Sequence, residues 1–461
     1  MDGFTLWQWL ALLQHEMLLF AGVFFLIGAA DELAVDLTYL WLRWTGRART
    51  GSLPDNTPVD RPLSGSAALF IPAWQEQHVI GTTIRHALAA WPHRDLRIYV
   101  GCYANDPDTI AAVETAARND VRVRLVVSRQ AGPTTKADCL NRIYDALCED
   151  ERRSDLVTQM IVLHDAEDMV DAAALNLLDD AIGQADLVQL PVLPVPQPSS
   201  PWIGSHYCEE FAEAHGKAMV VRDGLRVAMP LAGVGCAISR PMLTRLADCS
   251  EYGLPFAADC LTEDYELGLG VGAMGGTSRF LRYRHDDGRL VATRACFPAT
   301  LVCAVRQKTR WVHGIAFQGW DRLGWRGRPA DVWMRLRDRR GPFTALILAV
   351  AYALLLLSAV GWIAGMLGYG AVLPLSDTMV VILALNFASF AWRALWRFAF
   401  TAREYGVTEG LWAVLRIPVT NIIAIMAGRR ALAAYCRSLA GKDVPWDKTD
   451  HALHPVNMRI G

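Results

Sequence analysis

Two carboxylates stand where an apolar stretch of the sequence ends. Asp165 and Glu167, one residue apart, follow the run Met160–Leu163. Carboxylates at this spacing on a strand end can both reach one hard cation, Mg²⁺ or Mn²⁺, that also holds diphosphate oxygens. Such an ion screens the charge that builds on a departing diphosphate. Acidic residues at strand ends also cap helices, and Asp168 is a candidate for that role, whereas His164 is expected to orient or pack.

A second acidic group lies at Thr262-Glu263-Asp264, directly before an amphipathic stretch. The pattern predicts the start of a helix with an acidic first turn. One of these carboxylates could also take the proton of a hydroxyl group as that hydroxyl attacks a sugar's anomeric carbon. The two interpretations are compatible.

Cationic and aromatic residues form a third group, Gln307-Lys-Thr-Arg310-Trp311, just before a long apolar segment. Arg310 offers a fixed cation for a diphosphate, and Trp311 offers a flat apolar face for a sugar ring. The alternative is an ordinary Arg/Trp belt beside a membrane. Lys136 begins a predicted helix, where it either faces solvent or meets phosphates.

These residues are positioned by alternating strands and helices. Apolar runs at 67–73, 96–103, 121–127, 160–166 and 186–195 predict strands, and segments 76–91, 108–119, 134–149 and 171–183 predict helices between them. The alternation favours an α/β fold with a mostly parallel sheet covered by helices. Ligands of such sheets bind at the carboxyl ends of the strands, where Glu76 and Asp165 stand.

The composition of the chain limits its possible functions and varies along its length. Of 461 residues 52% are hydrophobic, and the net charge of −2 gives no bulk attraction to nucleic acid. Ten cysteines show no C-x-x-C pair, which fits a reducing compartment. The chain divides into 1–60, with a membrane helix, an interfacial helix and a linker; 61–340, a cytoplasmic catalytic domain; and 341–461, with further membrane or interfacial helices.

The apolar segments at 10–30, 343–367 and 378–390 are long enough, or nearly so, to span a bilayer. After the first of them, Leu33, Leu37, Leu40, Trp41 and Trp44 recur at helical spacing, which predicts a separate amphipathic helix on the membrane surface. Segment 411–427 contains Arg416, so it is expected to be interfacial or re-entrant. The arginines beside these segments predict that residues 61–340 lie in the cytoplasm.

The order of the motifs IPAWQE, KADCLN, HDAED, LTEDYEL and QKTRW, ending at a pair of membrane segments, resembles the processive family-2 glycosyltransferases, which include cellulose, hyaluronan and chitin synthases. The wordings HDAED and PWDKT (445–449) are most similar to the NfrB-like inner-membrane glycosyltransferases, which are associated with exopolysaccharide export and phage adsorption. The resemblance covers about residues 66–320 plus the membrane helices. It implies a GT-A type, Rossmann-like domain and an inverting, metal-dependent transfer from a nucleotide-sugar, with UDP as the expected nucleotide, to a growing exopolysaccharide.

The resemblance also implies roles for individual residues. Asp165 and Glu167 match the metal-binding D-x-D element, and Asp264 matches the general base, while Glu263 beside it is expected on the acceptor and product side. Gln307, Arg310 and Trp311 match the Q-x-x-R-W motif near acceptor and product. Glu76 and Lys136 match positions near the donor nucleotide.

Two departures from the family pattern bear on the donor and on regulation. The second strand ends Asn105-Asp106 instead of the usual element that contacts uracil, so Asp106 is the candidate for reading the base. No cyclic-di-GMP sensor follows PWDKT in this sequence, so a partner is expected to sense that nucleotide if it regulates the enzyme. The alternatives are single addition of a sugar to a lipid, or a non-catalytic part of an export or receptor complex.

Overall fold

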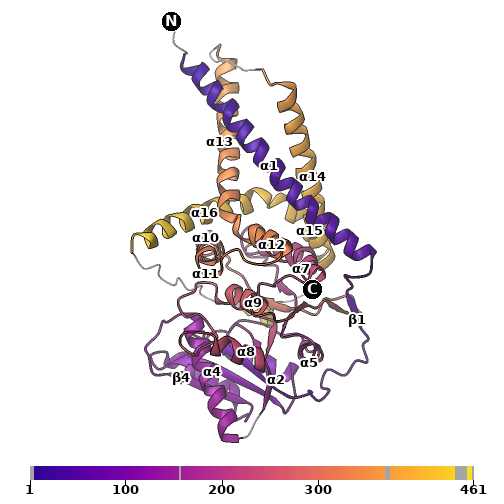
Figure 1. Cartoon of the computed structure of the whole chain (residues 1–461), viewed down its shortest axis with the longest axis vertical. Helices are drawn as coiled ribbons and strands as arrows, with labels where there is room; N and C mark the ends of the chain where they lie inside the picture. Colours follow the sequence, from indigo (N-terminus) through magenta and orange to yellow (C-terminus); the bar gives the residue numbers. More distant parts are fainter. Residues whose placement is uncertain (1–4, 155–156, 369–373, 442–453, 459–461) are drawn as a thin grey trace.

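The computed structural model describes residues 5–154, 157–368, 374–441 and 454–458. A seven-stranded sheet lies at one end of the molecule and long helices project from the other (Figure 1). The strand order is β4-β3-β2-β5-β8-β6-β9. The strands are β2 (Ser66–Pro72), β3 (Leu96–Tyr103), β4 (Val123–Ser128), β5 (Thr158–Leu163), β6 (Leu187–Gln189), β8 (Cys236–Ser239) and β9 (Ser278–Phe280). Only β8 runs antiparallel to its neighbours, which confirms the mostly parallel sheet.

The central strand shows why the sheet is covered on both faces. Successive side chains of a strand point to opposite faces, and both sets in β2 are apolar. Leu69 and Ile71 join one buried core, while Ala68 and Phe70 join the other. The first core includes α2 (Ile80–Ala90), α3 (Pro107–Ala117) and α5 (Ala174–Ile182), and the second includes α4 (Lys136–Ser154), α8 (Arg240–Asp248) and α9 (Glu263–Ala273).

Two segments differ from the sequence-based predictions. The run 186–195 is not one strand, because β6 ends at Gln189 and β7 (Val192–Pro194) pairs instead with β11 (Thr293–Ala295) in a separate sheet. Two prolines, at 191 and 194, limit the backbone hydrogen bonds that one straight strand there would need. The predicted linker 50–65 contains β1 (Gly51–Leu53), which pairs with β10 (Tyr283–His285).

A layer of shorter helices lies between the sheet and the long helices, and one of them contains the third motif. They are α6 (His206–Glu213), the π-helix η1 (Ala214–Ala218), α7 (Met219–Leu225), α10 (Leu301–Val312), the π-helix η2 (His313–Gln318), α11 (Gly319–Leu323) and α12 (Pro329–Arg339). Helix α10 contacts α16 (Ile417–Leu439), and α6 contacts α14 (Asp377–Tyr405). This layer therefore joins the sheet domain to the long helices.

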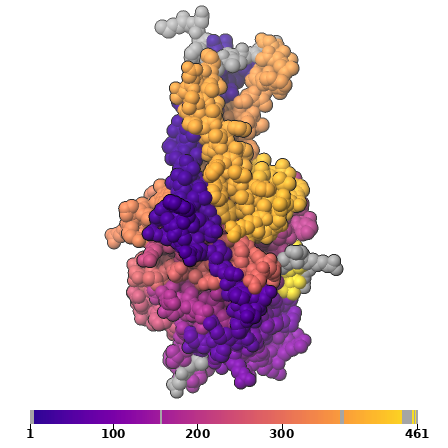
Figure 2. Space-filling view, turned by 90° about the vertical axis from the view of Figure 1, so that its right-hand side faces the viewer, coloured from indigo at the N-terminus to yellow at the C-terminus, as the bar shows by residue number. Residues whose placement is uncertain are grey.

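Four described helices are long and apolar enough to cross a membrane: α1 (Leu6–Trp44), α13 (Gly341–Met366), α14 and α16. The prediction of a separate interfacial helix after residue 30 is wrong, because α1 continues unbroken through Trp44. Its apolar stripe faces outward, with Leu37 57% and Trp44 88% exposed, while Asp36 on the opposite side is fully buried. Figure 2 shows α1 lying along α14. The stripe is therefore available to lipid although the helix is continuous.

The segment predicted to be interfacial, 411–427, belongs to two helices, α15 (Val407–Leu415) and α16. Helix α16 meets the length and hydropathy expected of a span, yet it runs across the base of α13 and α14 rather than along them (Figure 1). Arg416 between the two helices is buried and ion-paired to Glu209 and Glu409. This direction fits an interfacial helix, and the interfacial placement of this segment remains a prediction. The PWDKT motif lies outside the described residues.

Candidate active site

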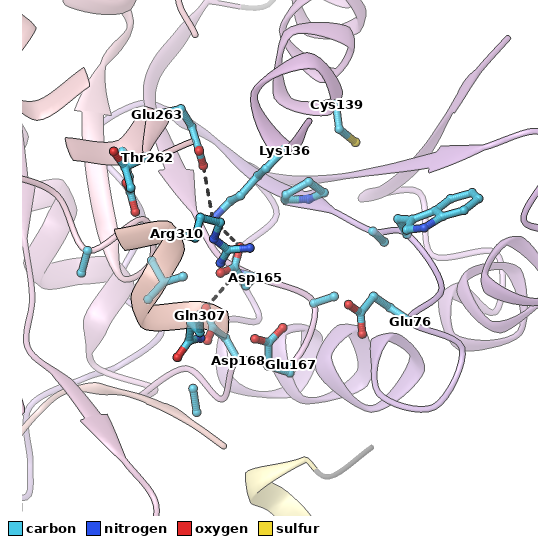
Figure 3. A pocket seen from close by; sticks show the side chains of 18 of the residues that line it. Glu76, Lys136, Cys139, Asp165, Glu167, Asp168, Thr262, Glu263, Gln307 and Arg310 are labelled. Carbon is cyan, nitrogen blue, oxygen red and sulfur yellow. Dashed lines mark hydrogen bonds and ion pairs between the residues drawn. The ribbon is translucent and has the colours of Figure 1, made fainter. Parts of the chain in front are cut away.

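A cavity of about 1220 Å³, including its open mouth, lies where β2 and β5 end. Its lining includes all but one of the site residues predicted from the sequence (Figure 3). The residues are Glu76, Lys136, Asp165, Glu167, Glu263, Asp264, Gln307, Arg310 and Trp311. They come from loops after β2 and β5 and from the first turns of α4 and α9 and the last turns of α10. Segments far apart in the sequence therefore meet at the edge of the sheet where ligands are expected.

The loop that carries the two predicted metal ligands is held by a buried carboxylate. The Asp168 carboxylate accepts a 2.8 Å hydrogen bond from the Asp165 amide and lies 2.9 Å from Nδ1 of His164. Asp168 caps no helix, since α5 begins only at Ala174, so that prediction is wrong. Burial raises the pKa of Asp168, while His164 opposes the rise. Asp168 therefore holds the loop through the Asp165 amide, and the His164 ring contacts the Asp168 carboxylate.

Lys136 occupies the centre of the acidic group. Its Nζ lies 2.6 Å from Oδ1 of Asp165 and 3.7 Å from Oε1 of Glu263 (Figure 3). Burial alone would lower the pKa of Lys136, but Asp165, Glu263 and Asp264 outweigh it and raise that pKa. The ammonium group is therefore charged and faces the cavity, where phosphates could replace part of its contact with the carboxylates.

The two carboxylates at the start of α9 both hold protons more tightly than usual. Burial raises the pKa of Glu263 to about 7; Lys136 opposes this and Asp264 adds to it. Burial also raises the pKa of Asp264, against Lys136 and Arg310. Gly233, at φ +77°, leaves room for Asp264, because a Cβ there would lie 2.6 Å from Oδ2. Side chains other than glycine rarely adopt this conformation.

The third motif lies on one face of α10. Gln307, Arg310 and Trp311 line the cavity, as their three- and four-residue spacing on a helix allows. Oε1 of Gln307 is buried without a hydrogen-bond partner among the described residues. Lys308, between them, turns away and pairs with Glu210. The motif thus presents an acceptor atom, a cation and a ring to the cavity.

Two aromatic residues that the sequence motifs did not reveal also line the cavity. Phe211 of α6 and Phe297 lie with ring centroids 5.0 Å apart, beside Trp311. Nothing in the local sequence distinguished them from core residues, because their position depends on how α6 packs against α10. Gly233, by contrast, stands in Gly-Val-Gly235, a pattern that could have indicated a special backbone conformation.

Of the two residues Glu76 and Asp106, both predicted to lie near the donor nucleotide, only Glu76 lines the cavity. Glu76 is buried in the cavity wall, and its amide donates to Thr109 at 3.0 Å. Asp106 is not among the described lining residues. Its carboxylate accepts a 2.6 Å bond from the Gln75 amide and caps α3 through the Thr109 amide. This geometry ties the loop after β2 to α3 and gives no support to Asp106 as a reader of the base.

Charge in the cavity is strongly unbalanced. Six lining residues are acidic, Glu76, Asp165, Glu167, Asp168, Glu263 and Asp264, and two, Lys136 and Arg310, are cationic. No group of three or more potential metal-binding side chains occurs among the described residues. Two carboxylates, Asp165 and Glu167, still suit Mg²⁺, which is commonly held by one or two carboxylates together with substrate phosphates. The residues present therefore fit a divalent cation that arrives with its substrate.

Several solved structures are distantly similar to this chain. A mannosyltransferase from Pyrobaculum calidifontis, solved with GDP-Man and Mn²⁺, is 18% identical, with 88% of this chain and 99% of that one covered at a TM-score of 0.48. Glucosyl-3-phosphoglycerate synthase from Mycobacterium tuberculosis, solved with Mn²⁺, UDP and glucosyl-3-phosphoglycerate, is 17% identical, covering 56% and 79% at a TM-score of 0.35.

Among curated proteins, bacteriophage adsorption protein B of Escherichia coli K12 is 32% identical over 94% of this chain and 62% of its own length. Bacteriophage N4 adsorption protein B of Escherichia coli O157:H7 gives the same values. This chain thus spans about three fifths of the curated relatives that it matches. Residues 65–314 match the family described as glycosyltransferase like family 2, so the family predicted from the motifs is confirmed and the chain belongs to the family-2 glycosyltransferases.

Proposed function

We propose that this glycosyltransferase transfers a sugar, with inversion, from a nucleotide-sugar such as a UDP-sugar to a growing exopolysaccharide. A Mg²⁺ or Mn²⁺ ion held by Asp165 and Glu167 accompanies the donor. The catalytic domain is proposed to face the cytoplasm of a bacterial inner membrane, with α1, α13 and α14 as spans.

The excess of carboxylates in the cavity is the observation that carries this proposal. A diphosphate would be repelled by six acidic side chains opposed by only two cations. A bound divalent cation would offset that repulsion and stabilise the charge on the leaving diphosphate. Lys136, already 2.6 Å from Asp165, would then add a direct contact with phosphate oxygens. The same cavity would be poorly suited to an anionic ligand without a metal.

Asp264 is proposed as the general base. Its carboxylate interacts with Lys136 on the donor side and with Arg310 on the acceptor side, so it lies between the two halves of the cavity. The acceptor oxygen attacks the anomeric carbon while Asp264 takes its proton, and the bond from that carbon to the diphosphate breaks. Glu263, 3.7 Å from Lys136, is proposed to hold the lysine rather than to move the proton.

The acceptor side suits a carbohydrate. Trp311, Phe211 and Phe297 offer aromatic faces of the kind that pack against sugar rings, and the buried Oε1 of Gln307 can accept a bond from a sugar hydroxyl. A polymer has such rings and hydroxyls on its terminal unit, whereas a lipid acceptor lacks them until the first sugar is attached. We therefore favour polymer extension over single addition to a lipid.

The relatives are named for bacteriophage adsorption. A transferase that builds a cell-surface polymer could serve adsorption by supplying part of a receptor, and we propose an export partner for that polymer. Active alkaline phosphatase fused after Leu439 would show that α16 crosses the membrane and would contradict the proposed arrangement.

Nucleotide release from a panel of UDP-, GDP- and other nucleotide-sugars tests the proposal. Purified enzyme should release nucleotide with Mg²⁺ or Mn²⁺, stop in EDTA and recover when metal is restored. Asp165→Asn should weaken metal-dependent donor binding, while Asp287→Asn, at an exposed ion pair with Arg289, is the matched control. Full turnover in excess chelator would contradict the proposed metal dependence. Lipid products that carry a single added sugar would contradict the proposed extension of a polymer.

A further inference from the structure

The C-terminal residues return to the active site after the long helices. Segment His454–Met458 contains the short 3₁₀ helix η3 (Pro455–Asn457). In Figure 3 the chain's C-terminal part passes beneath Glu167 and Asp168. Sγ of Cys296, a cavity-lining residue, lies 3.4 Å from Sδ of Met458. The segment therefore contacts the underside of the cavity.

His454 and Pro455 are both buried in this segment, and His454 is only 1% exposed. Its Nδ1 accepts a 3.1 Å bond from the Val456 amide, which closes the turn on itself. Nε2 of the imidazole is buried with no hydrogen-bond partner among the described residues, and the main chain of Asp168 is close enough to affect the pKa of the ring. Burial lowers its pKa to about 4 and the Asp168 main chain opposes that change, so the ring is neutral near pH 7. A neutral imidazole is the form that can be buried here at least cost.

Asp168 links this ring to the predicted metal ligand. The side chain of Asp168 accepts the Asp165 amide at 2.8 Å, while its main chain faces His454. On the other side of the loop, the Thr83 hydroxyl donates to the Ala166 carbonyl at 2.5 Å. The loop of metal ligands is thus supported by α2 from one side and by the C-terminal segment from another.

We propose that His454 is a positioning residue for the metal site and that docking of His454–Met458 holds the 165–168 loop in its metal-binding arrangement. This inference rests on the proposed function, because it concerns the cation that Asp165 and Glu167 would bind. Groups that orient metal ligands from outside typically contribute about 10–100-fold to metal affinity. His454 acts through one intervening residue, so its contribution is expected to be smaller, about 3–10-fold.

Docking itself can be tested without activity. Met458→Cys in the full chain places a thiol within reach of Cys296, and oxidation with diamide should give a disulfide between residues 296 and 458, detected by peptide mass spectrometry. The matched control is the same variant carrying Cys296→Ala. Absence of the 296–458 peptide after complete oxidation would overturn the proposal.

The positioning role is tested by Mn²⁺ binding in the presence of UDP, followed by electron paramagnetic resonance. His454→Asn keeps an acceptor near Nδ1 for the Val456 amide but removes the ring edge toward Asp168, whereas His454→Gln can place an amide near Nε2. We expect 3–10-fold weaker Mn²⁺ binding for Asn and near-normal binding for Gln, with kcat at saturating metal within two-fold in both. Normal affinity in His454→Asn, or equal loss in both variants, would overturn the inference. A wild-type protein that bound no Mn²⁺ would instead refute the metal of the proposed function.

Discussion

Two charged clusters in this protein differ in balance. Beneath the long helices, four acidic residues face four basic ones: Asp31, Glu32, Asp36 and Glu213 pair with Lys217, Arg337, Arg340 and Arg393. This junction cluster joins α1, α6, η1, α12 and α14. In the cavity, six acidic residues face two basic ones. The acidic and basic residues of the first cluster neutralise one another, whereas the second cluster would be stabilised by the bound cation that we propose.

The difference separates structural charge from functional charge. Breaking a self-satisfied buried pair costs stability because it leaves an unpaired ion. An unbalanced cluster costs stability as it stands, and such perturbed groups gather at sites where ligands bind or react. Substitutions in the junction cluster should therefore change unfolding, and substitutions in the cavity should change turnover. Each prediction below tests one side of that division.

The largest effect is expected at Asp264. Asp264→Asn keeps the shape of the side chain but cannot take up a proton, so kcat should fall by about 10²–10⁴-fold while donor affinity stays nearly intact. Sugar transfer and calorimetric donor binding with Mg²⁺ measure the two quantities. Glu263→Gln is the control and should be milder. Loss of donor binding in Asp264→Asn would place this residue in the donor site instead, and near-normal transfer would place the base elsewhere.

The junction cluster should respond in the opposite way. Glu32 contacts Arg337, Arg340 and Arg393, so Glu32→Gln leaves three guanidinium groups with less compensation. Because these side chains are partly exposed, we expect a loss of roughly 1–3 kcal/mol in unfolding free energy, below the cost of breaking a fully buried pair.

Thermal unfolding in detergent measures this loss, and the donor KM should stay unchanged. Asp287→Asn, at an exposed pair, should have no measurable effect on unfolding. A changed KM with normal stability would show that the junction cluster acts on the active site.

Sequence patterns predicted the fold because each central strand is apolar on both faces, as β2 shows with Leu69 on one side and Phe70 on the other. They also predicted most of the residues that line the cavity. Asp165 follows the apolar strand β5, and Glu263 begins helix α9. Their roles remain predictions. The continuous course of α1 was missed because Asp36, which breaks the apolar pattern, is buried against Lys217 rather than exposed.

Other features depend on contacts between distant segments. Asp168 was assigned to a helix cap because local spacing allowed it, whereas its partners are the Asp165 amide and His164. Asp106 was assigned to the base because it follows a strand, yet the loop after β2 uses its carboxylate. Phe211 reaches the cavity through packing of α6, and His454 lies beneath the cavity because the C-terminal segment packs there; no local pattern encodes either contact.

The smallest predicted effect sharpens the comparison through pH. Burial raises the pKa of Glu263 from its ordinary 4.5 to about 7, so the folded protein binds more protons than the unfolded chain between those values. The stabilising contribution is complete below about pH 4.5 and is lost as pH rises through 7. Glu263→Gln should therefore reduce the fall in Tm between pH 5 and pH 8, by about 2–4 °C. Part of the dependence of Tm on pH should remain, since burial also raises the pKa of Asp168 and of Asp264.

The junction cluster is the control, because its acidic and basic residues balance one another. Glu32→Gln should therefore leave the dependence of Tm on pH unchanged between pH 5 and pH 8. Mg²⁺ with UDP should act on the wild type as Glu263→Gln does, because a cation in the cavity lowers the pKa of nearby carboxylates. If neither Glu263→Gln nor Mg²⁺ with UDP changed the dependence of Tm on pH, the excess of carboxylates in the cavity would not be the cause of that dependence.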